Sequence, residues 1–208
     1  MRDFVRARTF LRTLDKGESL GHQGMLPVHW FGLIDGMLKW SVLSADGRAT
    51  TLGGILPGCW FGEGGLLRQR PRQAEIIALQ VSQVATLATD DFAHLLQSQT
   101  TFKDFILGQL SGRLYYFMDS IADARLLGPD LQVVYALCGL MHPLNNPLGL
   151  RNLRISQDEL ANLASVSRPR CNTALGILRD KGIIRTEYGG LVLLDVASLH
   201  TMVGLNTG

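Results

Sequence analysis

Cysteine is scarce in this chain of 208 residues, which contains only Cys59, Cys138 and Cys171. The three are scattered, and no Cys-x-x-Cys pair or Cys/His ligand spacing occurs, so neither a zinc site nor an iron–sulfur cluster is expected. Each cysteine falls in an apolar run, where a thiol behaves as a small hydrophobic side chain.

Long apolar runs and clustered histidines are also missing. No segment is long enough to cross a bilayer and no signal peptide is evident, so we expect a cytoplasmic protein without a membrane partner. The histidines are isolated from one another: His22, His29, His94, His142 and His200. Haem needs suitably placed axial ligands, so no haem is expected either.

A strong net charge is absent as well. The formal net charge is +2, which does not by itself indicate nucleic acid as a partner. Between Arg151 and Glu187, however, seven bases and four acids leave +3 (7 − 4) on a short segment, a distribution suited to phosphate contact. The bases are Arg151, Arg154, Arg168, Arg170, Arg179, Lys181 and Arg185, and the acids are Asp158, Glu159, Asp180 and Glu187.

The same segment predicts two short helices joined by a tight turn at residues 165–167. Ser156 followed by Glu159 is a capping box, which places the start of the first helix. The second helix has an apolar face made by Cys171, Ala174, Leu175 and Leu178. A helix–turn–helix of this kind fits the major groove of DNA; the alternative is a helical hairpin with a charged outer face.

The second helix opens with side chains suited to reading bases. Arginine and asparagine recognise guanine and adenine edges through paired hydrogen bonds. Pro169 is tolerated in a first helical turn but disfavours helical geometry at the preceding residue, so Arg168 is a candidate N-cap. The candidate DNA-binding residues are Ser156, Gln157, Ser167, Arg168, Pro169, Arg170, Asn172, Thr173 and Arg185.

A β-hairpin is expected directly after the second helix. Residues 183–188 and 191–194 are the expected strands and flank Gly189-Gly190, a strong two-residue turn signal. A helix–turn–helix followed by a β-wing is a winged helix, so we expect double-stranded DNA as a partner.

Short apolar runs broken by Gly, Pro and Asp fill residues 8–90 and indicate an antiparallel sandwich or barrel. Strands are expected around Leu11 and Leu14 and at 29–34, 37–42 and 76–79. Asp35-Gly36 and Ala45-Asp46-Gly47 are typical of hairpin turns.

A short helix from Phe92 and a long one from Thr101 to about residue 127 should follow. Apolar residues of the long helix recur at alternating spacings of three and four, at Leu107, Leu110, Leu114, Phe117, Ile121 and Ala124. This heptad seam predicts a parallel homodimer, and the alternative is a helix packed on its own barrel. Gly128-Pro129-Asp130 should break the helix and act as a hinge, before another helix at 131–141.

Barrel, long helix, hinge and winged helix, in this order, resemble the Crp/Fnr family of bacterial transcription regulators. The resemblance covers nearly the whole chain and is carried by residues 16–18, 35–36, 57–63, 71–74, 155–159 and 167–168. It implies an α+β fold with a jelly-roll barrel of the cyclic-nucleotide-binding type, without the helix that often precedes that barrel. The expected domains are an effector-sensing barrel (1–100), a dimerisation helix and hinge (101–128) and a winged-helix DNA-binding domain (129–208). RNA polymerase is a further implied partner.

In relatives that bind cyclic nucleotides, the segment like residues 62–74 holds the cyclic phosphate. The resemblance assigns the ribose hydroxyl to Glu63 and the phosphate to Arg72, and a guanidinium does suit a phosphate. The candidate effector-binding residues are Gly62, Glu63, Gly64, Arg72, Gln73, Ala74, Phe117 and Met118.

Several positions depart from the family pattern. Gly64 stands where leucine is usual, and Gln73 replaces a hydroxyl residue. Phe117 and Met118 replace a Thr-Ser pair that binds adenine, which disfavours cyclic AMP and leaves other small anionic effectors, cyclic nucleotides included. The alternative is an effector-independent regulator with a structural Glu63–Arg72 ion pair.

The DNA-reading helix departs from the pattern too. Pro169 takes the place of an acidic or amide residue and Thr173 that of an arginine, so the base preference should differ from that of the cyclic AMP receptor.

Two other classes of function compete with DNA binding. An enzyme on the barrel would use Glu18, His22 and His29, which lack the His-x-His pair that a metal site needs. A nucleotide-binding module that acts on a protein partner would not need a winged helix. We therefore expect a DNA-binding regulator rather than an enzyme.

Overall fold

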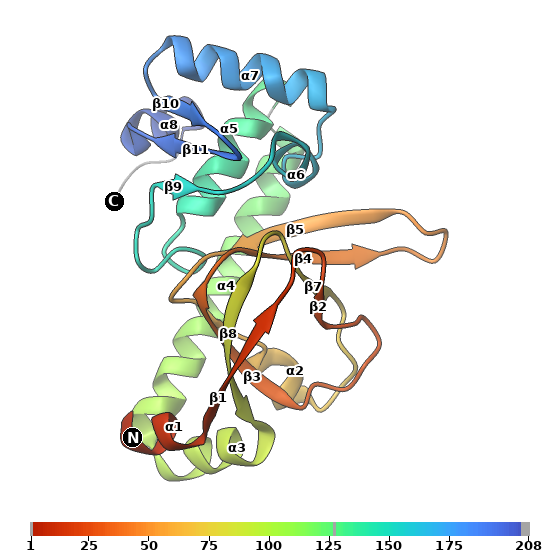
Figure 1. Ribbon diagram of the computed structural model, residues 1–208, viewed down its shortest axis with the longest axis vertical. Coiled ribbons are helices and arrows are strands. Elements are labelled where there is room, and N and C mark those ends of the chain that lie inside the picture. The colour runs from red at the N-terminus through yellow and green to blue at the C-terminus, as the bar shows by residue number, and fades with distance from the viewer. Residues whose placement is uncertain (1, 127, 205–208) are drawn as a thin grey trace.

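The computed structural model describes residues 2–126 and 128–204. A β-barrel forms the lower half of the molecule, a long helix runs along it, and a helical domain with a small sheet lies above (Figure 1). The fold is thus the expected α+β arrangement. Among the described helices, none is long and apolar enough to cross a bilayer.

The barrel consists of two four-stranded antiparallel sheets, with strand orders β1-β8-β3-β6 and β2-β7-β4-β5. Its elements are β1 (Thr9–Leu14), β2 (Ser19–Gly21), β3 (His29–Asp35), β4 (Leu38–Leu43), β5 (Ala49–Ile55), β6 (Trp60–Phe61), α2 (Glu63–Arg68), β7 (Glu75–Ala78) and β8 (Ser82–Ala88). Apolar side chains from both sheets, such as Leu38, Phe61 and Val84, meet in its core. The prediction of an antiparallel barrel is confirmed.

Both predicted turns in the barrel form, but one of them is not a hairpin. Gly47 has a φ of 84° between the paired strands β4 and β5, as expected for a hairpin turn. Gly36 has a φ of 99°, yet β3 and β4 belong to different sheets. The Asp35-Gly36 turn therefore carries the chain from one sheet to the other.

A helix precedes the barrel, contrary to expectation: α1 spans Arg2–Arg8. Asp3 in its first turn and Arg8 in its last complement the helix dipole. Contacts distant in sequence hold it, because Phe4 stacks on His94 with 5.0 Å between ring centroids and Arg8 bonds Asp91 at 2.7 Å.

The predicted helices beyond the barrel all form, with shifted ends: α3 (Thr89–Ser98), α4 (Thr100–Leu126) and α5 (Pro129–Met141). Residue 127, the predicted end of the long helix, lies outside the described residues. Helix α5 begins at Pro129 rather than at Leu131, because a proline in the first turn forfeits no hydrogen bond.

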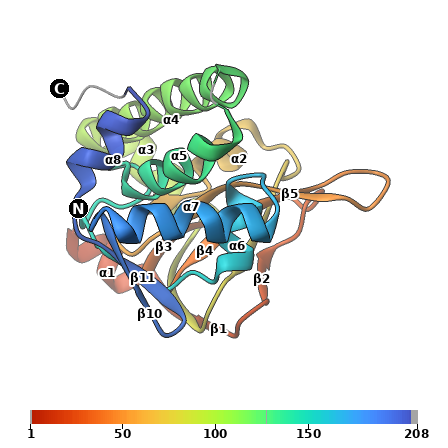
Figure 2. The ribbon, with the colours of Figure 1, turned by 90° about the horizontal axis from the view of Figure 1, so that it is seen from above.

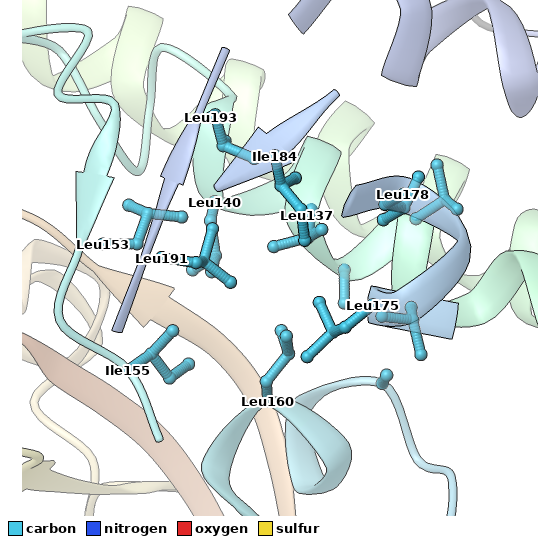
Figure 3. Packing of buried hydrophobic residues seen from close by; sticks show 14 of the residues in the cluster. Leu137, Leu140, Leu153, Ile155, Leu160, Leu175, Leu178, Ile184, Leu191 and Leu193 are labelled. Atoms are coloured by element: carbon cyan, nitrogen blue, oxygen red, sulfur yellow. The ribbon is translucent and has the colours of Figure 1, made fainter. Parts of the chain in front are cut away.

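The remaining elements are β9 (Asn152–Leu153), α6 (Gln157–Leu163), α7 (Arg168–Asp180), β10 (Ile184–Glu187), β11 (Gly190–Leu193) and α8 (Val196–Met202). Strands β9, β10 and β11 form a three-stranded sheet with the order β10-β11-β9. Side chains from this sheet and from α5, α6 and α7 pack into one core, in which Leu137, Leu160 and Leu191 are at most 2% exposed (Figure 3). The winged-helix prediction is confirmed.

The core of the winged helix extends into the barrel. Met37 and Leu56 of the barrel belong to the same buried cluster. Two polar contacts join the same regions: the Leu56 amide donates to the Asn145 carbonyl at 2.9 Å, and Lys39 Nζ lies 2.6 Å from Glu159 Oε2. In this structure the two parts are therefore docked through buried contacts.

Candidate DNA-binding surface and effector pocket

The first helix of the helix–turn–helix begins where the capping box predicts. The Ser156 hydroxyl accepts a hydrogen bond from the Glu159 amide at 3.2 Å. The Glu159 carboxylate binds Lys39 of strand β4. Glu159, whose amide is capped by Ser156, thus also joins α6 to the barrel.

The second helix starts one residue earlier than the proline suggests. Ser167 is the N-cap, with a ψ of 151°, and Arg168 is the first helical residue, so the interpretation of Arg168 as the cap is wrong. Pro169 sits inside the first turn, where its missing N–H has no helical partner to lose. Ser165, with a φ of 53°, makes the turn before the helix.

Helix α7 divides into the two faces that the sequence predicts. Its buried face packs Cys171, Ala174, Leu175 and Leu178 into the core. Arg168, Pro169, Arg170, Asn172 and Thr173 are all exposed. Helix α7 lies at the top of the molecule, with the barrel below (Figure 1), and it is the helix nearest the viewer when the molecule is seen from above (Figure 2). Its exposed side chains therefore lie on the outer surface of the molecule.

The exposed side chains of Arg168 and Thr173 on α7 have partners within the protein. Arg168 Nε lies 3.2 Å from Asp158 Oδ1, and both side chains are more than half exposed. The Thr173 hydroxyl donates to the Pro169 carbonyl at 3.1 Å. The pair with Asp158 is solvent-screened and weak, so a stronger acceptor can replace it.

The wing turns one residue earlier than predicted. Glu187 pairs with Gly190, so the two turn residues are Tyr188 and Gly189, not Gly189 and Gly190. Gly190 lies in β11, where a Cβ would collide with the Leu153 carbonyl oxygen. Tyr188, which was not among the predicted DNA-binding residues, is fully exposed at the wing tip. Arg185 lies on β10, 2.8 Å from Glu187.

In the barrel, Glu63 pairs with Arg113 and not with Arg72. Glu63 is 2% exposed, and its Oε1 accepts a hydrogen bond from Arg113 Nη1 of α4 at 2.7 Å. Arg113 Nη2 also donates to the Trp60 carbonyl at 2.7 Å. The expected structural pair of Glu63 with Arg72 is therefore wrong, and the real one ties α2 to the long helix.

Arg72 lies in an apolar setting instead. Its Cζ is 5.3 Å from the centre of the Phe31 ring, and burial lowers the pKa of the guanidinium. Gly21 makes room for it, because a Cβ there would lie 2.8 Å from Arg72 Nε. The pKa of His29 is lowered by burial first, and then by the charges of Arg72 and Arg12. Arg72 is thus a half-buried cation, and its charge affects the ionisation of His29.

A cavity of about 650 Å³ lies beside α2. It brings together five of the predicted effector residues: Gly62, Gly64, Arg72, Gln73 and Ala74. Trp40, Arg68, Arg70 and Leu110 also line it and were missed, although the alternation of arginines at 68, 70 and 72 is visible in the sequence. No aspartate or glutamate is among the described residues of its lining, so the cavity is positively charged.

Phe117 and Met118 do not line this cavity. Phe117 borders a separate cavity of about 280 Å³ between α4, α5 and β5, and Met118 is 55% exposed. Leu110 of α4 lines the cavity instead. The apolar wall expected from the long helix exists, but it comes from a position further back along the helix.

The outer face of α4 is apolar. Leu107, Leu114 and Ile121 are 64%, 60% and 56% exposed, while Phe102 and Ile106 are buried against the barrel. Leu110 and Phe117 are half-buried on the barrel side. The helix therefore packs on its own barrel and also presents an uncovered apolar stripe. Of the predicted seam, the Ala124 side chain lies outside the described residues.

The residues of the competing enzyme hypothesis do not come together. Glu18 binds Arg12 at 2.7 Å and His22 binds Glu75 at 2.6 Å. Within residues 2–126 and 128–204, no group of three or more His, Cys, Asp or Glu side chains is arranged to hold a metal ion. Burial raises the pKa of Cys59 to about 11 and that of Cys138 to about 12, so these thiols stay protonated.

Comparison with known protein families identifies both halves of the chain. A cyclic nucleotide-binding domain matches residues 11–99, and a Crp-like helix-turn-helix domain matches residues 132–202. The chain belongs to the Crp/Fnr family. Members of this family are DNA-binding transcription regulators and are typically not enzymes.

Individual relatives agree with this assignment. The Crp/Fnr chain is 26% identical to the cyclic AMP receptor protein of Thermus thermophilus over 91% of this chain and 86% of that protein. It is 25% identical to the cAMP-activated global transcriptional regulator CRP of Pasteurella multocida, over 84% and 85% of the two chains. The structure of FixK2 from Bradyrhizobium japonicum superposes with a TM-score of 0.78 at 16% identity, covering 93% of this chain and 96% of that one, which shows the shared fold.

Proposed function

We propose that this regulator is a homodimer that reads two-fold DNA with α7 and is controlled by an anionic effector in the cavity beside α2. The observation that carries the proposal is the Glu63–Arg113 ion pair, because it links the cavity wall to the helix that bears the apolar stripe. We assign residues 1–100 to sensing, 101–128 to dimerisation and 129–208 to DNA binding, of which residues 1, 127 and 205–208 lie outside the described part. RNA polymerase is the proposed protein partner.

Dimerisation through α4 follows from its exposed stripe. A two-fold partner helix would cover Leu107, Leu114 and Ile121, which water now covers. We expect wild type to be dimeric and Leu114→Glu to be monomeric at micromolar concentration, since the substitution places a charge in the seam. Light scattering after size-exclusion chromatography measures this. Thr101→Glu, also exposed on α4, is the control and should remain a dimer.

DNA reading by α7 predicts different roles for two arginines. A dimer should recognise half-sites about one helical turn, ~34 Å, apart. Arg168→Ala should weaken specific binding by about 1–3 kcal/mol and relax one base position. Arg185→Ala, on the wing, should weaken all sequences about equally, because a phosphate contact carries no sequence information. Titrations with operator and random DNA separate the two; an equal loss on both DNAs for Arg168→Ala would contradict its role.

The lining of the cavity specifies the charge of the effector. Arg68, Arg70 and Arg72 face a ligand with no lining carboxylate to neutralise them, which favours a ligand with more than one negative charge, such as a phosphorylated nucleotide. Trp40 and Leu110 offer an apolar surface beside the charged one. Cyclic AMP remains disfavoured, because the part of α4 that faces the cavity is the apolar Leu110.

An effector of this kind would act by shifting a balance between two placements of the DNA-binding domain about residues 128–130. The shift is limited by the difference in its affinity for the two states, typically about 1–3 kcal/mol.

The effector role of Arg72 has a direct test. Arg72→Ala leaves the Glu63–Arg113 pair intact, so it should fold normally, keep basal DNA binding at low salt and lose any dependence on ligand. A thermal-shift panel of nucleotides and phosphorylated metabolites on both proteins measures ligand binding. A wild type that ignores every ligand in the panel would count against the effector.

A further inference from the structure

The part of α7 that points straight away from the core carries no charged group along its first two turns. Pro169, Thr173 and Gly176 follow one another at spacings of four and three, and so share one face of the helix. That face lies opposite the buried Cys171 and Leu175. Pro169 and Thr173 are both exposed. A DNA duplex in front of α7 would meet these residues first.

Neither of the two leading residues, Pro169 and Thr173, offers a free hydrogen-bond donor to a partner in front of α7. Proline has no N–H, and its ring is apolar. The Thr173 hydroxyl donates to the Pro169 carbonyl at 3.1 Å, which engages both polar atoms with each other. The hydroxyl oxygen can still accept a hydrogen bond, and the methyl group of Thr173 is available for apolar contact. Gly176, further along the same face, is half-buried, and Arg179 Nη2 lies 4.0 Å from where a Cβ would stand there.

We propose that Pro169 and Thr173 read thymine by apolar contact with its C5 methyl group. In the major groove, thymine alone among the four bases presents a methyl, and threonine methyls are suited to contact it. Arg168 and Asn172 flank this apolar face and would take the hydrogen-bonding positions beside it. The proposal rests on the proposed role of α7 in reading DNA. It adds the identity of the base that Pro169 and Thr173 contact, which is thymine.

Replacing thymine by uracil in the operator tests this, because it removes the methyl and preserves base pairing. An operator is first selected from random DNA with the full-length protein. Each thymine of both half-sites is then changed to uracil in turn. We expect one or two positions per half-site at which the dissociation constant rises about 4-fold, the value of one buried methyl. A selected half-site without thymine, or one in which no uracil substitution matters, overturns the proposal.

Two variants of Thr173 assign the contact to its methyl group. Thr173→Ser keeps the hydroxyl and removes the methyl, so binding should become equal for thymine and uracil at one position. Thr173→Val keeps a methyl and removes the hydroxyl, and should retain the thymine-to-uracil ratio, whatever its overall affinity. The opposite pattern overturns the assignment. Melting temperatures confirm that both variants are folded.

Arg168→Ala, measured on the same DNAs, separates this proposal from the one on which it rests. If Arg168→Ala reduces the preference for the operator while uracil has no effect, α7 reads DNA and the methyl contact is wrong. If neither matters, α7 is not the reading helix, and both proposals fail.

Discussion

Arg113→Met is expected to lower the free energy of unfolding by about 3–5 kcal/mol, the loss typical of breaking a buried ion pair from one side. Glu63, 2% exposed, would be left without its cationic partner, and the Trp60 carbonyl would lose its donor. Methionine approximates the length of the arginine stem, so the lost interactions are mainly polar. Urea denaturation followed by circular dichroism measures the change.

Three further variants show whether the stranded carboxylate is the cause. Adding Glu63→Gln to Arg113→Met removes the buried charge and should recover much of the stability. Lys103→Met, on the exposed side of the same helix, should change it by less than about 0.5 kcal/mol. Arg72→Ala strands no carboxylate; if it destabilised the fold more than Arg113→Met, Arg72 would be the true partner of Glu63.

Gly36→Ala should lower the free energy of unfolding by about 2–5 kcal/mol, because two effects add. Its φ of 99° is unfavourable for any residue with a Cβ, which alone costs about 1–2 kcal/mol. The new Cβ would also overlap the backbone and side chain of Ser82, a crowding that costs about 1–3 kcal/mol. Thermal and urea unfolding of the purified variant provide the measurement.

Gly47→Ala is the matched control for this prediction. Gly47 has a similar φ of 84°, but nothing lies within 4 Å of a Cβ built there. Gly47→Ala should therefore lower the free energy of unfolding only by the cost of the backbone conformation, about 1–2 kcal/mol. Equal losses in the two variants would mean that contact with Ser82 adds nothing at the crossing between the sheets.

Features set by neighbours in the chain were predictable from the sequence. The start of α6 depends on Ser156 and Glu159, which are three residues apart, and the turn at Gly47 depends on its own backbone. The faces of α7 follow from the spacing of its apolar residues. Each of these has a cause within one or two helical turns, so a single sequence contains it.

Features set by distant partners were not predictable. Glu63 and Arg113 are fifty positions apart, and from the sequence alone Arg72 or Arg113 could have paired with the Glu63 carboxylate. Strand β5 was missed because Gly53 and Gly54 lower strand propensity, yet Gly54 lies where a Cβ would collide with Leu140 of α5. Helix α1 was missed because its contacts to His94 and Asp91 hold it in place. In each case tertiary packing overrides the local signal.

The effector pocket was predicted in part for the same reason. Gly62, Gly64 and Arg72 belong to the one segment of residues 62–74, so the sequence could predict that they line the same cavity. Which residue of α4 lines the cavity depends on how the helix is rotated about its axis against the barrel. That rotation puts Leu110, rather than Phe117, on the cavity wall.

The sharing of one core between the barrel and the DNA-binding domain should make the docking of the two parts sensitive to temperature. Met37 and Leu56 are 2% and 3% exposed under the winged helix, so any departure of that domain from the barrel wets them. Wetting apolar surface raises the heat capacity, and the hydrophobic contact weakens on cooling. Cold should therefore loosen the docked arrangement without any ligand, and warming should restore it.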